Sequence, residues 1–220
     1  MPWCMSGSQR GFRQVVKDSA DSVAFYDRNA ERFATDTGGL DLSPLYECFL
    51  RYVPLGGRIL DAGCGVGRDA LAFAGRGYSV VAFDASAEMV RLAEERVAGR
   101  AEVLQMRFED AAWREEFDGI WACASLLHVP SAAFSDAAAR LAGALRPGGA
   151  WHMSFKLGWG ERTTKGRLFV DHTEETLRTA LAGVPIELRE VWTSEDTRPG
   201  RRGERWLNVV ALKQQPGIPL

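Results

Sequence analysis

The 220-residue chain is poor in the residues that usually bind metals or form disulfide frameworks. It contains 4 cysteines and 3 histidines, and no two cysteines are spaced as C-x-x-C. The histidines are scattered and have no carboxylates at matching spacing. The sequence therefore predicts neither a zinc site nor a set of structural disulfides.

Long apolar runs and a strong net charge are also missing. No apolar run is long enough to cross a bilayer, and the first residues lack the basic and apolar regions of a secretory signal. The formal net charge of −2 gives no general attraction to nucleic acid or to a membrane surface. We therefore expect a cytoplasmic protein that binds neither nucleic acid nor a membrane.

The remaining composition is typical of a globular chain, with 46% hydrophobic and 25% charged residues. The length favours one domain that buries a substantial core. Residues 1–18 show little periodicity and are expected to be a flexible segment. We expect residues 19–214 to form the single domain and residues 215–220 to form a tail.

The most informative segment is residues 59–69, where an apolar run ends at Asp61 and turns through Gly63, Gly65 and Gly67. Alternating glycines let a backbone turn sharply and approach a ligand closely. A helical pattern follows, and the N–H groups at its start can face an anionic ligand group. A second apolar run ends at Asp84. Together these features predict a nucleotide-like cofactor across the carboxyl ends of two neighbouring parallel strands.

Strand and helix patterns alternate along the chain, which predicts an α/β fold with a parallel sheet and helices on both faces. The ligand crevice of such a sheet lies beyond the carboxyl ends of its strands. Strands are predicted at 58–62, 79–83, 102–107, 117–123 and 150–156, and helices at 19–35, 43–53, 67–75, 86–97 and 131–145.

These segments, with the F-D-G-I strand at 117–120 and the P-G-G turn at 147–149, resemble the class I S-adenosylmethionine (SAM) methyltransferases over roughly residues 25–213. The alternative is a nicotinamide-binding Rossmann domain, but its G-x-G-x-x-G spacing is missing here. The resemblance implies a Rossmann-like, mostly parallel seven-stranded sheet with a C-terminal antiparallel hairpin, which residues 186–192 and 206–212 fit.

Three further stretches narrow this resemblance. They are S-L-L-H at 125–128, S-F-K-L-G at 154–158, and the R-P-G-R and W-L-N sequences between 198 and 208. They are similar to a group of small bacterial methyltransferases related to tellurite-resistance enzymes. Proline and glycine between 193 and 205 predict a long surface loop within the hairpin.

The resemblance also implies cofactor contacts. Asp61 is implied beside the methionine amino group of SAM. Asp84 is implied at the ribose hydroxyls, because a carboxylate accepts two hydrogen bonds from a vicinal diol. Either Glu109 or Asp110 is implied at the adenine amino group. The other cofactor-binding candidates are Gly63, Gly65, Gly67, Arg68, Ala85, Met89 and Ala124.

Two basic segments are candidates for substrate binding. Arginine binds carboxylate, sulfate or phosphate through two N–H groups, and tryptophan stacks on flat or cationic groups. We therefore predict an anion-binding wall for a small acidic substrate. The alternative is a pair of ordinary solvated loops, with Arg205 joining one loop to the sheet. The predicted substrate-binding residues are Trp159, Arg162, Arg167, Arg198 and Arg205.

The catalytic candidates are His128, Tyr26 and Lys156. His128 follows the predicted strand at 117–123, and a histidine can take a proton from a hydroxyl or ammonium nucleophile near pH 7. Its alternative role is to shape the pocket without taking a proton. Tyr26 is a candidate to cover the cofactor or substrate, or else a core residue. Lys156 is predicted at the carboxyl end of its strand, facing the crevice.

The leading prediction is a SAM-dependent methyltransferase that acts on an O or N nucleophile of a small anionic molecule in secondary metabolism, such as antibiotic biosynthesis. The alternative is an enzyme of the same fold that does not methylate and closes an aziridine-type ring with loss of a sulfate-like group. A homodimer and a complex with a small accessory protein are both left open.

Overall fold

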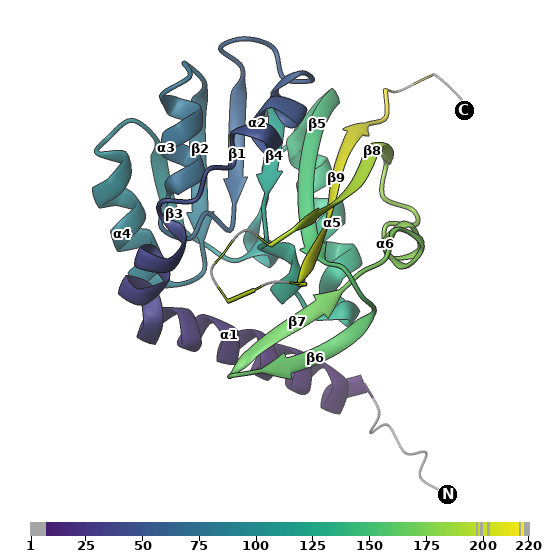
Figure 1. Cartoon of the computed structure of the whole chain (residues 1–220). Helices are drawn as coiled ribbons and strands as arrows, with labels where there is room; N and C mark the ends of the chain where they lie inside the picture. The colour runs from purple at the N-terminus through teal and green to yellow at the C-terminus, as the bar shows by residue number, and fades with distance from the viewer. Residues whose placement is uncertain (1–7, 197, 199, 202, 216, 218–220) are drawn as a thin grey trace, which may run out of the picture.

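The structure is a computed structural model that describes residues 8–196, 198, 200–201, 203–215 and 217 (Figure 1). Its main strands are β1 (Arg58–Ala62), β2 (Ser79–Asp84), β3 (Glu102–Gln105), β4 (Phe117–Ala122), β5 (Leu145–Lys156), β8 (Ile186–Glu195) and β9 (Arg205–Lys213). They form one sheet in the order β3-β2-β1-β4-β5-β9-β8. The pairs from β3 to β5 are parallel, whereas β9 is antiparallel to both β5 and β8. The predicted fold class is therefore confirmed.

Helices cover both faces of this sheet. On one face, Tyr46 and Phe73 pack against the buried ring of Trp121 on β4. On the other face, Phe134 and Leu141 belong to the larger core cluster. The helices are α1 (Ser8–Thr37), α2 (Ser43–Leu50), α3 (Arg68–Ala74), α4 (Ala87–Val97), α5 (Ser131–Ala144) and α6 (Glu174–Ala180), with short 3-10 turns η1 (Phe108–Asp110) and η2 (Leu126–His128).

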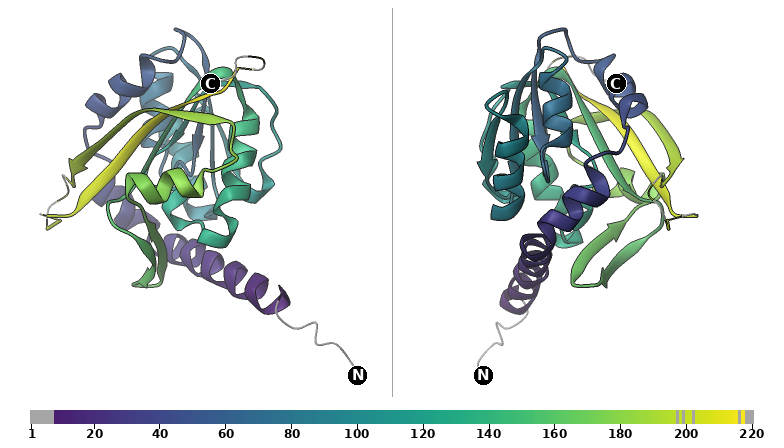
Figure 2. Two further views of the ribbon diagram at one scale, coloured as in Figure 1. Left: turned by 90° about the vertical axis from the view of Figure 1, so that its right-hand side faces the viewer. Right: turned by 60° about the vertical axis from the view of Figure 1, so that its left-hand side comes forward.

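Two elements lie beyond the carboxyl ends of the parallel strands (Figures 1 and 2). There α1 runs across the end of the sheet, and a separate hairpin of β6 (Gly160–Thr164) and β7 (Arg167–Asp171) lies beside it. The backbone N–H of Leu168 donates to Ser22 Oγ at 3.0 Å, which joins β7 to α1. These two elements cover the side of the sheet where a ligand crevice was predicted.

The structure differs from the sequence prediction at several places. The first helix begins at Ser8, so residues 8–18, which were expected to be flexible, are helical. Residues 1–7 and most of the 215–220 tail lie outside the described residues. The β6–β7 hairpin was not predicted because all of β6 is exposed, which leaves no apolar alternation to detect. The strands β8 and β9 reach Glu195 and Arg205, so the loop predicted at 193–205 is shorter.

Candidate active site

The glycine turn links β1 to α3 and faces the neighbouring strand β2. Gly63, Gly65 and Gly67 all have positive φ angles, of 77°, 53° and 70°. A Cβ on Gly63 would lie 2.5 Å from Ser125 Cβ, so a larger residue does not fit there. The N–H groups of Gly63 and Cys64 both donate to the carbonyl of Phe83 at 2.9 Å. The turn is therefore fixed against the end of β2 by backbone geometry.

Asp84 lies at the end of β2, directly opposite this turn. Its carboxylate accepts one hydrogen bond from the Gly65 N–H and one from the Ser86 N–H, both at 2.9 Å. Burial raises the pKa of Asp84, although these backbone hydrogen bonds act against the shift. A carboxylate has about four lone-pair positions, so acceptors remain for a pair of hydroxyl groups. The geometry fits the ribose contact that the family resemblance implies.

Asp61 is buried at the end of β1, with 2% of its surface exposed, and is not among the residues that line the cavity. Its Oδ2 atom has no hydrogen-bond partner among the described residues. Burial and the nearby charge of Asp69 raise the pKa of Asp61 well above its usual value. A buried acceptor without a donor suits an ammonium group, which is the contact implied for the methionine end of SAM.

Arg68 and Asp69 follow the glycine turn and form a buried network. Asp69 accepts two hydrogen bonds from Arg68, at 2.6 and 2.9 Å, one from Tyr46 and one from Trp121. Burial alone would raise the pKa of Asp69, but the Arg68 guanidinium lowers it. Sequence reasoning proposed Arg68 and missed Asp69. In the sequence, an arginine followed directly by an aspartate at the start of a helix did not indicate that the two side chains would pair.

The remaining cofactor candidates divide into residues that line the cavity and residues that do not. Glu109 lines the cavity, whereas Asp110 accepts the Arg107 N–H at 3.2 Å in η1 and is not in the lining. Ala124 is a lining residue with a φ of 53°. Gly63, Gly65, Arg68, Ala85 and Met89 also line the cavity, and Gly67 does not.

A single cavity of about 990 Å³ joins these groups to the predicted substrate side. We call its two parts the glycine-loop end, at residues 63–68 and Asp84, and the hairpin end, at Lys156, β6–β7 and the described residues within 194–206. Between them, α1 contributes Tyr26 and Phe33 to the lining. The cavity therefore has room for a cofactor at one end and a second molecule at the other.

Tyr26 and His128 meet between the two ends. Tyr26 Oη lies 2.7 Å from His128 Nε2, and His128 Nδ1 lies 2.6 Å from the carbonyl oxygen of Leu168. A carbonyl only accepts, so Nδ1 carries the proton, and in neutral His128 Tyr26 then donates to Nε2. Burial lowers the pKa of His128 to about 4, which keeps the ring neutral near pH 7.

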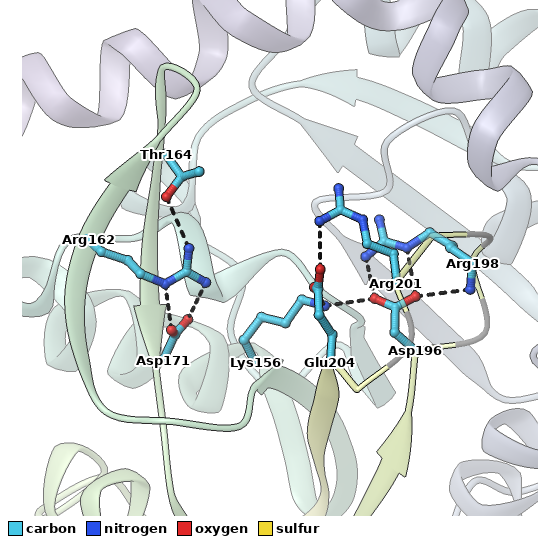
Figure 3. A network of polar contacts seen from close by, with 8 residues as sticks. All are labelled: Lys156, Arg162, Thr164, Asp171, Asp196, Arg198, Arg201 and Glu204. Atoms are coloured by element: carbon cyan, nitrogen blue, oxygen red, sulfur yellow. Dashed lines mark hydrogen bonds and ion pairs between the residues drawn. The ribbon is translucent and has the colours of Figure 1, made fainter.

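Lys156 does reach the cavity, but its charge is already paired (Figure 3). Its Nζ lies 2.7 Å from Asp196 Oδ2 and 2.6 Å from Glu204 Oε2, and it lies 4.0 Å from the centre of the Trp206 ring. Arg198 also binds Asp196, at 2.6 Å. Burial would raise the pKa of Asp196, but hydrogen bonds from Arg198 and Lys156 lower it well below its usual value.

This pairing changes the predicted anion-binding wall. Two acids that sequence reasoning did not consider, Asp196 and Glu204, form ion pairs with three cations at the hairpin end, Lys156, Arg198 and Arg201. Arg162 is paired in the same way with Asp171, at 2.7 Å. Arg205 lines the cavity and donates to Thr193. Trp159 is 82% exposed and lies outside the lining.

Arg167 on β7 differs from Lys156, Arg162 and Arg198, whose charges are paired with carboxylates. It lines the cavity, and among the described residues no carboxylate lies within ion-pair distance of it. Its guanidinium lies 4.5 Å from the centre of the Phe25 ring, 5.0 Å from Phe169 and 5.8 Å from Tyr26. Its Nε atom is buried and has no hydrogen-bond partner in the described part of the chain.

Within the described ranges, no group of three or more histidine, cysteine, aspartate or glutamate side chains is placed to hold a metal ion. No described helix combines the length and the apolar character needed to cross a membrane.

A family model described as a methyltransferase domain matches residues 59–149. This range begins at β1 and ends within β5, so it contains the glycine turn, Asp84 and His128. The match covers the part of the chain from which most of the glycine-loop end is built.

Several solved structures are similar to nearly the whole chain. One is the 1,6-didemethyltoxoflavin-N1-methyltransferase of Burkholderia thailandensis, solved with 1,6-didemethyltoxoflavin and S-adenosylhomocysteine (SAH). It is 22% identical with a TM-score of 0.75, and the match covers 98% of this chain and 94% of that one. The [4+2]-cyclase SpnF is 16% identical with a TM-score of 0.72, over 87% and 94% of the two chains.

A SAM-dependent methyltransferase from Methanosarcina mazei is 21% identical with a TM-score of 0.69, over 80% of this chain and all of that one. The cofactor that this fold and the matched domain support is SAM. The chain has the fold of the class I SAM-dependent methyltransferases, and its residues 59–149 match their methyltransferase domain.

Proposed function

We propose that this protein transfers the methyl group of SAM to an O or N nucleophile of a small molecule. One observation carries the proposal: a single cavity connects the glycine turn and Asp84 with the Tyr26–His128 pair. A cofactor at the glycine-loop end would leave its reactive end toward this pair. SAM supplies an electrophilic methyl group, and the protein has to align the nucleophile and exclude water.

In this proposal, three acids hold the cofactor. Asp84 binds the ribose hydroxyls, the unpartnered Oδ2 of Asp61 receives the amino group, and Glu109 rather than Asp110 faces the adenine, because Glu109 lines the cavity. Arg68 also lines the cavity and already binds Asp69, which positions its remaining N–H groups for the methionine carboxylate.

The Tyr26–His128 pair is the proposed proton acceptor. Tyr26 donates to His128 Nε2, so its hydroxyl oxygen can accept a hydrogen bond from the nucleophile. When the nucleophile loses its proton to Tyr26 Oη, the hydroxyl proton of Tyr26 moves to His128 Nε2. The Leu168 carbonyl then stabilises the imidazolium through Nδ1–H. Lys156 is held between two carboxylates and acts here by positioning the hairpin end.

The proposed substrate is a small anionic molecule of secondary metabolism. Arg167 and Arg205, which line the hairpin end without a carboxylate partner among the described residues, support an anionic group, and a role in antibiotic biosynthesis is part of the proposal. Matched structures include the toxoflavin enzyme above and one titled for a step of echinomycin biosynthesis. We also propose that the protein acts in the cytoplasm without nucleic acid or membrane partners, as a monomer, a homodimer or with an accessory protein.

Calorimetric binding of SAM and SAH tests the cofactor site. We expect micromolar binding by the wild type and a loss of about 10- to 100-fold in Asp84→Ala, the scale of a hydrogen bond to a charged group. Glu94→Ala, an exposed acid on α4, is the matched control and should bind like the wild type. A folded wild-type protein that binds neither compound would contradict the proposal.

A second assay separates methyl transfer from ring closure. If methyl transfer is the reaction, SAH forms only when an acceptor molecule is present, one SAH for each methylated product. The SpnF match shows this fold in a protein titled as a cyclase, so the fold alone does not fix the reaction. Conversion of a substrate without SAH would exclude methyl transfer for that substrate and favour the aziridine-type alternative.

A further inference from the structure

We propose that Arg167 selects substrates in which an anionic group is conjugated to a flat ring, such as an aromatic or heteroaromatic carboxylate. The proposal deepens the function above and rests on it, because the acceptor would lie beside SAM in the same cavity. It assigns anion recognition to one residue rather than to the whole wall of cations.

The state of the other cations supports this assignment. Lys156 and Arg198 share Asp196, Arg201 is paired with Glu204 at 2.8 Å, and Arg162 is paired with Asp171. Figure 3 shows these pairs at the hairpin end. A ligand anion would have to compete with an existing carboxylate at each of them. Neither Arg167 nor Arg205 has such a partner among the described residues, but Arg205 donates to Thr193, whereas the buried Nε of Arg167 lacks an acceptor.

The rings around Arg167 define the shape of the ligand. Its guanidinium lies over Phe25 and Phe169, which helps to hold the group in one orientation. The Tyr26 and Phe169 rings line the cavity, and each has its centre about 5 Å from that of His128, at 5.3 and 4.9 Å. A flat ring can continue this aromatic wall while its anionic group meets the guanidinium.

The position of Arg167 also connects recognition to chemistry. Its positive charge lowers the pKa of both His128 and Tyr26. For His128 this adds to the larger effect of burial, which also lowers the pKa, whereas for Tyr26 it opposes the larger effect of burial, which raises the pKa. An anionic group bound by Arg167 would therefore lie next to the proposed proton acceptor. This places the nucleophile of the acceptor near its acidic group.

Three simple probes test the proposal: benzoate, benzamide and cyclohexanecarboxylate, each titrated into the SAH-saturated protein and followed by NMR. Benzamide has the same shape as benzoate without the charge, and cyclohexanecarboxylate has the charge without the flat ring. We expect the wild type to bind benzoate about tenfold or more tightly than benzamide, the scale of a charged hydrogen bond. Cyclohexanecarboxylate should be weaker than benzoate.

Arg167→Gln should remove the preference for benzoate over benzamide while leaving SAH affinity within about twofold. Arg140→Gln is the matched control, because Arg140 also lines the cavity but is exposed and donates to the Ala111 carbonyl. It should keep the preference. Arg167→Lys keeps the charge but not the planar fork, and should show a preference reduced several-fold. A purely structural role for Arg167 would not change the ratio between the two probes.

The proposal is overturned if the wild type binds benzoate and benzamide equally, if it binds neither up to their solubility limits, or if Arg167→Gln keeps the preference. If Arg167→Gln does not fold, the proposal is judged from the ratio of the benzoate and benzamide affinities in the wild type and in Arg167→Lys. Should the protein fail to bind SAH, the same titrations in its absence separate the two questions. A charge preference that depends on Arg167 would then survive although the cofactor assignment had failed.

Discussion

The two ends of the cavity are constructed from different kinds of sequence information. At the glycine-loop end, the groups come from one short turn and from acids at the ends of two strands. At the hairpin end, Lys156 meets partners that are 40 and 48 residues away along the chain. The first arrangement depends on backbone conformation, and the second on which side chains a folded hairpin brings together.

The pKa values of the acids at the two ends of the cavity are also shifted in opposite directions. At the glycine-loop end, burial raises the pKa of Asp61 and of Asp84, so their charged forms are disfavoured in the folded protein. At the hairpin end, cationic partners overcome burial and lower the pKa of Asp196 and of Glu204. Asp61 and Asp84 therefore have no ion-pair partner among the described residues, whereas Asp196 and Glu204 are paired with Lys156 and two arginines.

The largest effect is expected from Gly63→Ala. The new Cβ would combine a left-handed backbone with a close approach to Ser125, so we expect a loss of about 3 kcal/mol in unfolding free energy. Gly183→Ala is the matched control, because Gly183 has a φ of +84° with open space around it, and only about 1 kcal/mol should be lost. Urea unfolding measures both variants. Equal losses would show that the contact with Ser125 is unimportant.

The next largest effect is expected at the hairpin end, from Lys156→Met. Removing the ammonium leaves two carboxylates facing each other, with Asp196 only 2% exposed in its side chain, and should cost about 2 kcal/mol at pH 7. Arg178→Gln breaks an exposed i, i+4 pair with Glu174 and should cost less than about 0.5 kcal/mol. If both variants lost the same free energy of unfolding, the ion pairs of Lys156 would contribute no more to stability than an exposed surface pair does.

The third expected effect comes from the opposite pKa shifts of the acids at the two ends, which should change stability in opposite directions. Asp61→Asn removes a buried charge and should stabilise the ligand-free protein by about 1 kcal/mol at pH 7, whereas Asp196→Asn should destabilise it. The pKa of Asp61 is raised on folding, so the wild type regains this stability as the pH falls and Asp61 becomes protonated. The advantage of Asp61→Asn should therefore be lost near pH 4.

For Asp196 the sign is reversed. Its pKa is lowered on folding, so its contribution is complete above its unfolded pKa near 4 and declines as the pH falls below that value. Unfolding curves between pH 3 and pH 8 measure both trends. The comparison between the two ends fails if both variants change stability in the same direction at pH 7.

The smallest effect is expected from Tyr26→Phe, between the two ends. It removes the donor to His128 Nε2 and should cost about 0.5 to 1 kcal/mol, the value of an ordinary hydrogen bond. The proton on Nδ1 should remain, because the Leu168 carbonyl still accepts it. Nitrogen-15 NMR of the histidine ring reports the tautomer directly. A shift of the proton to Nε2 would contradict the proposed direction of the hydrogen bonds.

Much of the glycine-loop end was predictable from sequence because its determinants are local. Gly63 is required by a positive φ and a close contact, and Asp84 is the last residue of an apolar strand that pairs with β1. The parallel arrangement followed from the alternation of strands with helices, whereas the order of the strands in the sheet was not predicted. The role of Asp69 was not predictable, because its partners Tyr46 and Trp121 come from two distant elements.

At the hairpin end, the sequence indicated the cations but not their partners. Lys156 and Arg198 do line the cavity, yet the acids that bind them lie in a stretch interpreted as a surface loop. The β6 strand is exposed along its whole length and shows no apolar alternation, and the β7 strand that carries Arg167 buries only Leu168 and Val170, so the hairpin was not predicted. Side-chain pairing across such distances is decided by tertiary structure, which local patterns do not encode.

The position of α1 has a thermodynamic consequence for ligand binding. This helix contacts the glycine-loop end through Asp27, which accepts the Ser86 hydroxyl at 2.6 Å, and the hairpin end through Phe25 against Arg167. One helix thus lines the cavity along both ends. Any ligand that shifts α1 at one end alters the affinity at the other, and linkage requires the two affinities to change by the same factor.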